Sequence, residues 1–172
     1  MPFRLSAQLL APACLAAFAL VSCSEKSTIS AERSTACAGV DENELSVKDA
    51  WVRSAPAGRP MSAAYLTICN GENSENRLVS VDAGDLATAE LHETTTTEDG
   101  VSSMRPVEAF SVSPGDAFSL KPGGAHVMLI GLSRPIEDGD SISLKLGFAN
   151  GETINVEATA RSNADAADQH RH

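Results

Sequence analysis

The stretch Ser141-Ile-Ser-Leu-Lys-Leu-Gly-Phe148 decides the fold class, because its apolar residues alternate strictly with polar or small ones. After a short gap, Thr153–Ala158 repeats the alternation. A period of two residues is typical of a β-strand with one buried face. Asn150-Gly151 lies between the two stretches and is the strongest short hairpin signal, expected here as a type I′ turn. These residues predict an antiparallel β-hairpin.

Eight further segments with strand-like composition precede this hairpin. They are Leu45–Arg53, Ala63–Asn70, Arg77–Ala83, Thr88–Thr94, Val101–Val107, Phe110–Val112, Ala117–Leu120 and His126–Leu132. The turns between them, such as Asn70-Gly71 and Asp99-Gly100, leave little room for a helix, and one helical turn is expected near Ala83–Leu86. Many short strands at regular spacing predict an all-β fold, an antiparallel Greek-key sandwich or barrel.

The N-terminal end has the features of a secretory signal peptide, expected to span residues 1–22. Arg4 precedes a mostly apolar run over residues 9–21, which is too short for a convincing membrane span. The run ends in Leu20-Val21-Ser22-Cys23, which resembles a bacterial lipobox and predicts cleavage before Cys23 and lipidation of that residue. Ser24, rather than Asp, follows and favours the outer membrane of a Gram-negative cell, by resemblance to lipoprotein sorting. We therefore expect a periplasmic protein that contacts the membrane through a lipid anchor only.

The rest of the chain divides into three parts. Residues 23–44 show no sustained period and are expected to form a flexible tether behind the lipid. Residues 45–160 have the length of one domain with a core, and residues 161–172 are expected to be a disordered, histidine-containing tail. The formal net charge of −10 repels nucleic acid, which argues against a nucleic-acid partner.

Two of the four cysteines remain once Cys14 leaves with the signal peptide and Cys23 carries the lipid. These two are Cys37 and Cys69. In an oxidising compartment they could form a disulfide that pins the tether to the domain. Two free thiols fit the sequence equally well.

Histidines and methionines are few, so their positions are informative. His126 and Met128 lie two residues apart after the turn Lys121–Gly124, and on a strand both side chains would point to one face. His92 lies in another expected strand, and Met104 follows twelve positions later, a spacing that suits a hairpin. Two imidazoles and two thioethers together would favour Cu(I) over Zn²⁺, Ca²⁺ or Mg²⁺. A blue-copper site is disfavoured, because no cysteine lies close in sequence to His126 and Met128.

A resemblance extends this interpretation. The set His92, eleven residues, Met104, twenty-one residues, His126-x-Met128 resembles the His-x10-Met-x21-His-x-Met signature of the periplasmic copper chaperones known as PCuAC. Further landmarks follow in the same order, among them Asp49–Arg53, Ala64–Asn70, Leu91–Glu93, Met104–Glu108 and Pro122–Gly124. The resemblance covers roughly residues 45–158.

The resemblance implies a cupredoxin-like Greek-key sandwich that binds Cu(I). It implies delivery of copper to a cytochrome c oxidase subunit or another copper carrier, for assembly of the oxidase copper centres. Such a protein is not an enzyme, because no bond of a substrate is made or broken. Two departures are visible: the first gap has eleven residues instead of ten, and Ser102 stands where a further methionine is frequent. An insertion at a hairpin tip need not move the strands, so His92 is kept as a ligand.

Three questions stay open: the function of the domain, the role of the tail histidines and the role of Met61. The domain could be a copper-scavenging or tolerance lipoprotein, or an interaction sandwich without metal; in the last case the four residues would be buried and far apart. His170 and His172 could form a second site that prefers Cu(II), or could lie in a solvated tail with no role. Met61, in the expected loop Gly58–Ser62, could be a hydrophobic cover, an extra sulfur ligand, or neither.

Overall fold

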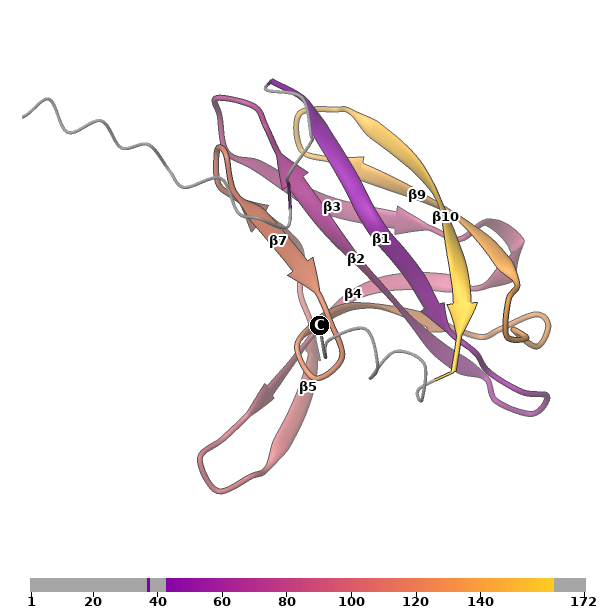
Figure 1. The fold of residues 1–172 in the computed structure, drawn as a ribbon. Helices are drawn as coiled ribbons and strands as arrows, with labels where there is room; N and C mark the ends of the chain where they lie inside the picture. The colour runs from indigo at the N-terminus through magenta and orange to yellow at the C-terminus, as the bar shows by residue number, and fades with distance from the viewer. Residues whose placement is uncertain (1–36, 38–42, 163–172) are drawn as a thin grey trace, which may run out of the picture.

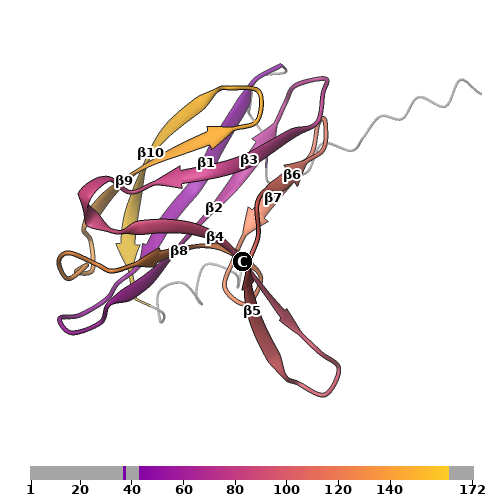
Figure 2. The same cartoon turned by 180° about the vertical axis from the view of Figure 1, so that it is seen from behind.

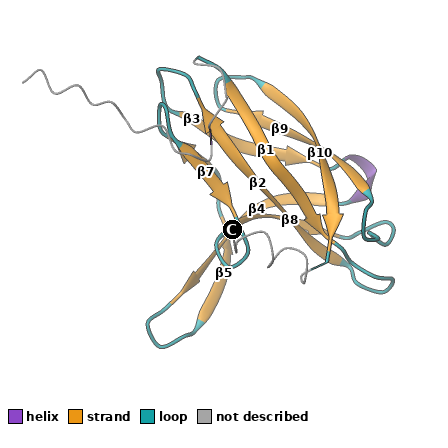
Figure 3. Ribbon diagram, in the orientation of Figure 1, coloured by secondary structure: helices purple, strands orange, loops and turns teal. Residues whose placement is uncertain are grey.

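The computed structural model describes Cys37 and residues 43–162 of the 172-residue chain. Over these residues the fold consists of ten β-strands and a short 3₁₀ helix at Gly84–Leu86 (Figure 3). The all-β class and the helical turn near Ala83–Leu86 are therefore confirmed. None of the helices in the described part of the chain is both long and apolar enough to cross a membrane.

Each strand expected from the sequence is present. The strands are β1 (Leu45–Arg53), β2 (Met61–Asn70), β3 (Asn76–Asp82), β4 (Thr88–Thr96), β5 (Ser102–Pro106), β6 (Phe110–Val112), β7 (Ala117–Leu120), β8 (Ala125–Ile130), β9 (Ser141–Phe148) and β10 (Thr153–Arg161). The expectation that Met61 lies in a loop was wrong, since Met61 begins β2. The reason is long-range: the Pro60 carbonyl accepts hydrogen bonds from the amides of Gly131 and Leu132, which extends the pairing of β2 with β8.

The strands form one hydrogen-bonded sheet in the order β5-β4-β8-β2-β1-β10-β9-β3-β6, and β7 also pairs with β2. Neighbouring strands are antiparallel except for β1 and β10, which run parallel with Trp51 opposite Thr159. The antiparallel pairing expected from the sequence holds for the other pairs of neighbouring strands in the described residues. No short turn links β1 to β10. The antiparallel strands that end at β1 and those that end at β10 can therefore meet in either orientation.

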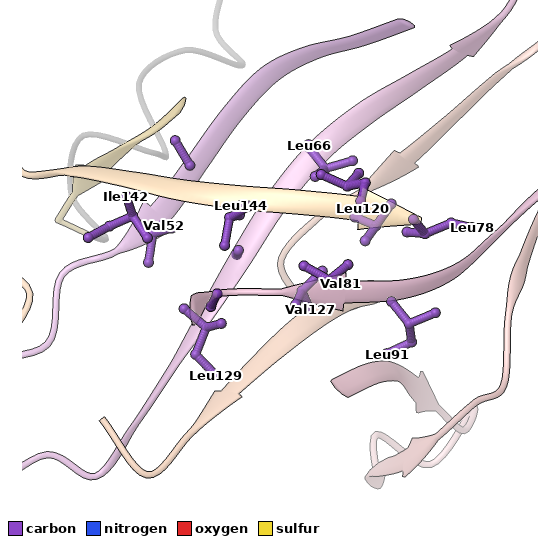
Figure 4. Close-up of a cluster of buried hydrophobic side chains, with 14 of the residues drawn as sticks. Val52, Leu66, Leu78, Val81, Leu91, Leu120, Val127, Leu129, Ile142 and Leu144 are labelled. Atoms are coloured by element: carbon purple, nitrogen blue, oxygen red, sulfur yellow. The ribbon is translucent and has the colours of Figure 1, made fainter. Parts of the chain in front are cut away.

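The sheet folds over on itself, so that β1, β2 and β10 lie on one side of the domain and β3 and β4 on the other (Figures 1 and 2). β4 and β3 lie near opposite ends of the strand order, and they pack against each other on the same side of the domain, which closes the fold. The core fills the space between them with aliphatic side chains from both (Figure 4). Its fully buried members include Val52, Leu66, Leu78, Val127, Leu129 and Leu144. The alternation in β9 follows from this arrangement, because Ile142, Leu144, Leu146 and Phe148 are buried while their polar neighbours are exposed.

The hairpin between β9 and β10 is confirmed, but its turn is not of type I′. Gly147 pairs with Thr153, which leaves a three-residue loop, Ala149–Gly151, beyond the closing pair Phe148 and Glu152. Of the loop residues, only Gly151 has a positive φ, at 89°. A type I turn followed by a left-handed glycine suits a three-residue loop, whereas type I′ belongs to two-residue loops.

The N-terminal segment is joined to the domain by covalent and hydrogen bonds. Cys37 and Cys69 form a disulfide, so the structure contains the pairing that the sequence left open. The amide of Asn43 donates to the Gly71 carbonyl, and the amide of Gly71 donates to the Glu44 carbonyl. The end of the segment expected as a flexible tether is therefore held against β2. At the other end, Arg161 belongs to β10, so the expected start of the tail at residue 161 was wrong.

Candidate metal centre

The register of β4, β8 and β2 places two histidines and a methionine on one face of the sheet. His92 lies opposite His126, and Met128 lies opposite Glu90 on β4 and Ala63 on β2. Residues that lie opposite each other in a ladder point to the same face, and so do residues two apart along a strand. The other face is the core side.

Met104 joins this face from β5. Residues 94 and 104 are paired, and His92 is paired with Pro106, so Met104 is the diagonal neighbour of His92. Diagonal neighbours lie about 7–8 Å apart, within reach of long side chains. The hairpin expected from the spacing of His92 and Met104 is therefore confirmed. Figure 1 shows that β5 projects away from the body of the domain, together with the end of β4 that pairs with it, whereas the rest of β4 pairs with β8.

A cavity of about 570 Å³ opens on the same face. Its walls include Met104, His126 and Met128, together with Met61 and Tyr65. His92 stands beside this wall, with its ring centroid 6.0 Å from that of His126. Met104 is 52% exposed. The sandwich without metal would have these residues buried and far apart. His126 is buried, but Met104 is exposed and the two histidine rings lie close together, so the residues are not far apart.

His126 is held with one ring nitrogen fixed and the other left open. Its Nδ1 lies 3.0 Å from the carbonyl oxygen of Gly124, and because a carbonyl only accepts, Nδ1 carries the proton. The lone pair is then on Nε2. The tight turn Lys121–Gly124 creates this contact: the Gly124 amide donates to the Lys121 carbonyl, and Gly123 adopts a φ of 78°. His126 itself is only 4% exposed.

His92 is oriented by a carboxylate. Its Nε2 lies 2.9 Å from Oε2 of Glu90, and an ionised carboxylate only accepts, so Nε2 carries the proton. The lone pair is on Nδ1, which is buried and has no hydrogen-bond partner. A buried polar atom without a partner is unfavourable, and a metal ion would satisfy it. A carboxylate that holds the second nitrogen of a ligating histidine is a common feature of metal sites.

Tyr65 lines the cavity beside His126, and Trp51 packs against Tyr65. Tyr65 lies 6.4 Å from His126 and 4.4 Å from Trp51, measured between ring centroids, and Arg53 Nη2 donates to its hydroxyl at 2.7 Å. A β-bulge between Lys48 and Trp51 shifts the register of β1 by one residue, and this shift aims Trp51 at Tyr65. Burial raises the pKa of Tyr65, while the charge and hydrogen bond of Arg53 lower it in part. The phenol therefore stays neutral.

The donor set suits a soft cation. It offers two imidazole nitrogens and two thioether sulfurs. Both cysteines of the described chain are used in the disulfide, so neither supplies a thiolate. Among the described residues there is also no group of three or more His, Cys, Asp or Glu that could hold a metal. Thioether and imidazole donors without thiolate or clustered carboxylates favour Cu(I) and disfavour Zn²⁺, Ca²⁺ and Mg²⁺.

A protein-family model and a curated protein both match this chain. Residues 45–160 match the model of a family described as "Putative lipoprotein LpqE-like". The chain belongs to the LpqE-like family. A curated relative, "Putative lipoprotein Lxx21020" of Leifsonia xyli subsp. xyli, is 28% identical over 134 residues, which are 77% of this chain and 79% of the relative.

Solved structures similar to this LpqE-like chain include PCuAC domains and a protein of Deinococcus radiodurans. "Copper-bound PCuAC domain from PmoF2" superposes with a TM-score of 0.59 at 19% identity, over 71% of this chain and 96% of that one. "Solution structure of CuI-DR1885 from Deinococcus Radiodurans" has a TM-score of 0.57 at 32% identity, over 75% of this chain and 86% of that one. The cupredoxin-like fold and the PCuAC resemblance are therefore confirmed.

Sequence reasoning missed Glu90 and placed Met61 wrongly. Glu90 could have been found, because it precedes His92 by two residues on an expected strand and so shares its face. The extension of β2 that brings Met61 to the cavity depends on hydrogen bonds between Pro60 and the distant residues Gly131 and Leu132, which no local pattern reveals. Cys23, His170 and His172 lie outside the described residues.

Proposed function

We propose that this chain is a Cu(I) metallochaperone that holds one ion between His92, Met104, His126 and Met128. One observation carries the proposal: the sheet register brings two imidazoles and two thioethers to one face beside one cavity. Each histidine has its second nitrogen fixed by a neighbouring acceptor, which leaves its lone pair free for the ion. The likeness to a protein solved as CuI-DR1885 supports the choice of metal.

The exposure of the site favours delivery over storage. Met104 is 52% exposed, and a partner's ligand can displace an exposed neutral thioether stepwise. We propose a cytochrome c oxidase subunit or another copper carrier as the recipient, with copper as cargo and no enzymatic reaction. A copper-scavenging lipoprotein is the alternative. Oxidase assembly in a deletion strain grown in low copper separates the two, because only a delivery protein is needed for assembly.

We also propose that the protein is lipidated at Cys23 and lies in the periplasm at the outer membrane, with no nucleic-acid partner. The lipoprotein descriptions of the family and its relative support a lipid anchor. The disulfide between Cys37 and Cys69 suits an oxidising compartment. Labelling cells with a radioactive fatty acid should mark the parent protein and not the Cys23→Ala variant. Label on both would contradict lipidation at this position.

A second, weaker site for Cu(II) is proposed at His170 and His172, whose imidazoles suit Cu(II) better than thioethers do. Deleting residues 163–172 should remove Cu(II) binding and leave Cu(I) binding intact. An unchanged Cu(II) stoichiometry after the deletion would contradict the site.

X-ray absorption spectroscopy of the Cu(I)-loaded protein tests the proposed ligand set. The chain from Ser24 onward retains every described residue and is suitable for the measurement. We expect a first shell that contains both nitrogen and sulfur scatterers. A shell of nitrogen and oxygen alone would exclude the methionines and overturn the assignment.

A further inference from the structure

Met61 reaches the proposed copper site from a strand that supplies none of the four ligands. On β2, Met61 lies opposite Ile130, and Ala63 lies opposite Met128. The side chains of Met61 and Met128 therefore share a face and are diagonal neighbours, about 7–8 Å apart at the backbone. Two long, flexible side chains at this separation can direct both sulfurs to one ion.

The methionines of the described residues gather at the cavity. The described residues contain three methionines, and all three line the same cavity: Met61, Met104 and Met128. Met61 is 47% exposed and does not belong to the hydrophobic core. Core packing therefore does not account for its position, whereas thioether chemistry at the cavity does.

We propose that Met61 Sδ, Met128 Sδ and His126 Nε2 form a second position for Cu(I), on the β2 side of the site, through which the ion enters and leaves; we call it the outer position and the four-ligand site the inner one. This inference rests on the proposed function and adds the path of transfer to it. His126 and Met128 lie on β8, between β4 on one side and β2 on the other. An ion can exchange His92 and Met104 for Met61 while it keeps both ligands from β8.

Electrostatics make the outer position a transient one. Both donor sets are neutral, so the ion moves between them without a change in ligand charge. Arg53 and Arg59 line the same cavity, and Arg59 is two residues from Met61, whereas Glu90 contacts His92, a ligand of the inner site only. Positive charge near the outer position and negative charge near the inner one both favour the inner site at equilibrium. Met61 should therefore affect the rate of transfer more than the affinity.

Transfer kinetics test the proposal. The chain from Ser24 onward, loaded with one Cu(I), is mixed with excess bicinchoninic acid, and the coloured complex is followed by stopped flow. Met61→Leu keeps the size and apolar character but removes the sulfur. We expect it to transfer at least about tenfold more slowly, equivalent to a barrier higher by about 1.4 kcal/mol. Met61→His supplies another Cu(I) donor and should restore the rate.

If Met61 were only an apolar cover, the transfer rates would follow the opposite order. Met61→Leu would then transfer copper at the parent's rate, and Met61→His would not. Val101→Ala is the control, because Val101 is exposed and lies outside the cavity wall. Transfer by Met61→Leu at the parent's rate would overturn the outer position alone. Loss of equilibrium affinity in Met61→Leu as large as in Met104→Leu would also overturn it, because Met61 would then be a permanent ligand. Failure of the parent to bind Cu(I) would instead overturn the proposed function.

Discussion

Glu90 Oε2 accepts a hydrogen bond of 2.9 Å from His92 Nε2, two residues away on the same face of β4. This contact selects the tautomer that leaves Nδ1 as the ligand atom. Glu90→Ala should therefore lower Cu(I) affinity by about 10- to 100-fold, the usual effect of losing such a partner. Glu90→Gln keeps an acceptor oxygen and should lose less. Nitrogen-15 chemical shifts of His92 in the metal-free protein report the tautomer directly.

Glu93 provides the matched control for this prediction. It lies next to His92 on β4 and pairs with Arg105 at 2.9 Å. Glu93→Gln removes the same charge but no contact with His92, so affinity and tautomer should be unchanged. If Glu90→Ala and Glu93→Gln behaved alike, Glu90 would have no orienting role.

The turn that presents His126 gives a second prediction. Gly123 has a φ of 78°, and alanine is strained in this region by about 1–2 kcal/mol. Gly124 has no such φ, and a Cβ there would make ordinary contacts at 3.6 Å or more. Gly123→Ala should lower the free energy of unfolding by about that amount, and Gly124→Ala should not. Urea unfolding of both variants is the measurement, and equal losses would contradict the turn geometry.

The disulfide carries a stability prediction. Cys37 and Cys69 are separated by 32 residues, and closing a loop of that size stabilises a fold by about 3–4 kcal/mol in the chain-entropy model. The double variant Cys37→Ser, Cys69→Ser should lose about that much in urea unfolding. Its Cu(I) affinity should be retained, because neither cysteine lines the cavity. A variant as stable as the parent would contradict the prediction.

Tyr65 gives the pH dependence. The chain has one tyrosine, so an ultraviolet absorbance titration reports Tyr65 alone. Burial raises its pKa, so the folded state holds the phenolic proton more tightly than the unfolded chain does. This stabilisation is complete below the ordinary pKa of about 10 and is lost as pH rises through the folded value. Tyr65→Phe should remove that alkaline loss, and an ordinary titration of Tyr65 would contradict the prediction.

Much of the fold was predictable because its signals are local. Alternation in β9 and the Gly-containing turns depend on neighbours in sequence, and the spacing of His92 and Met104 revealed the hairpin. The parallel pairing of β1 with β10 was not predictable, since it depends on how two distant groups of strands meet. The bulge before Trp51 has the same origin: tertiary packing on Tyr65 accounts for it, and no local pattern marks it.

The convergence of the candidate ligands was expected from two sources. Period-two alternation placed His126 and Met128 on one face, and the PCuAC resemblance joined them to His92 and Met104. The hydrogen bonds that choose Nδ1 of His92 and Nε2 of His126 needed the folded geometry, because they depend on where Glu90 and the Gly124 carbonyl lie in space.

An anaerobic Cu(I) titration against a competing chromophoric chelator tests the proposed ligand set most directly. It compares the chain from Ser24 onward with its Met104→Ala and Met128→Ala variants. We expect one tight equivalent in the parent and an affinity at least about tenfold lower in each variant, a loss of about 1.4 kcal/mol or more per thioether. Absence of tight binding in the parent, or binding indifferent to both methionines, would contradict a thioether site for Cu(I).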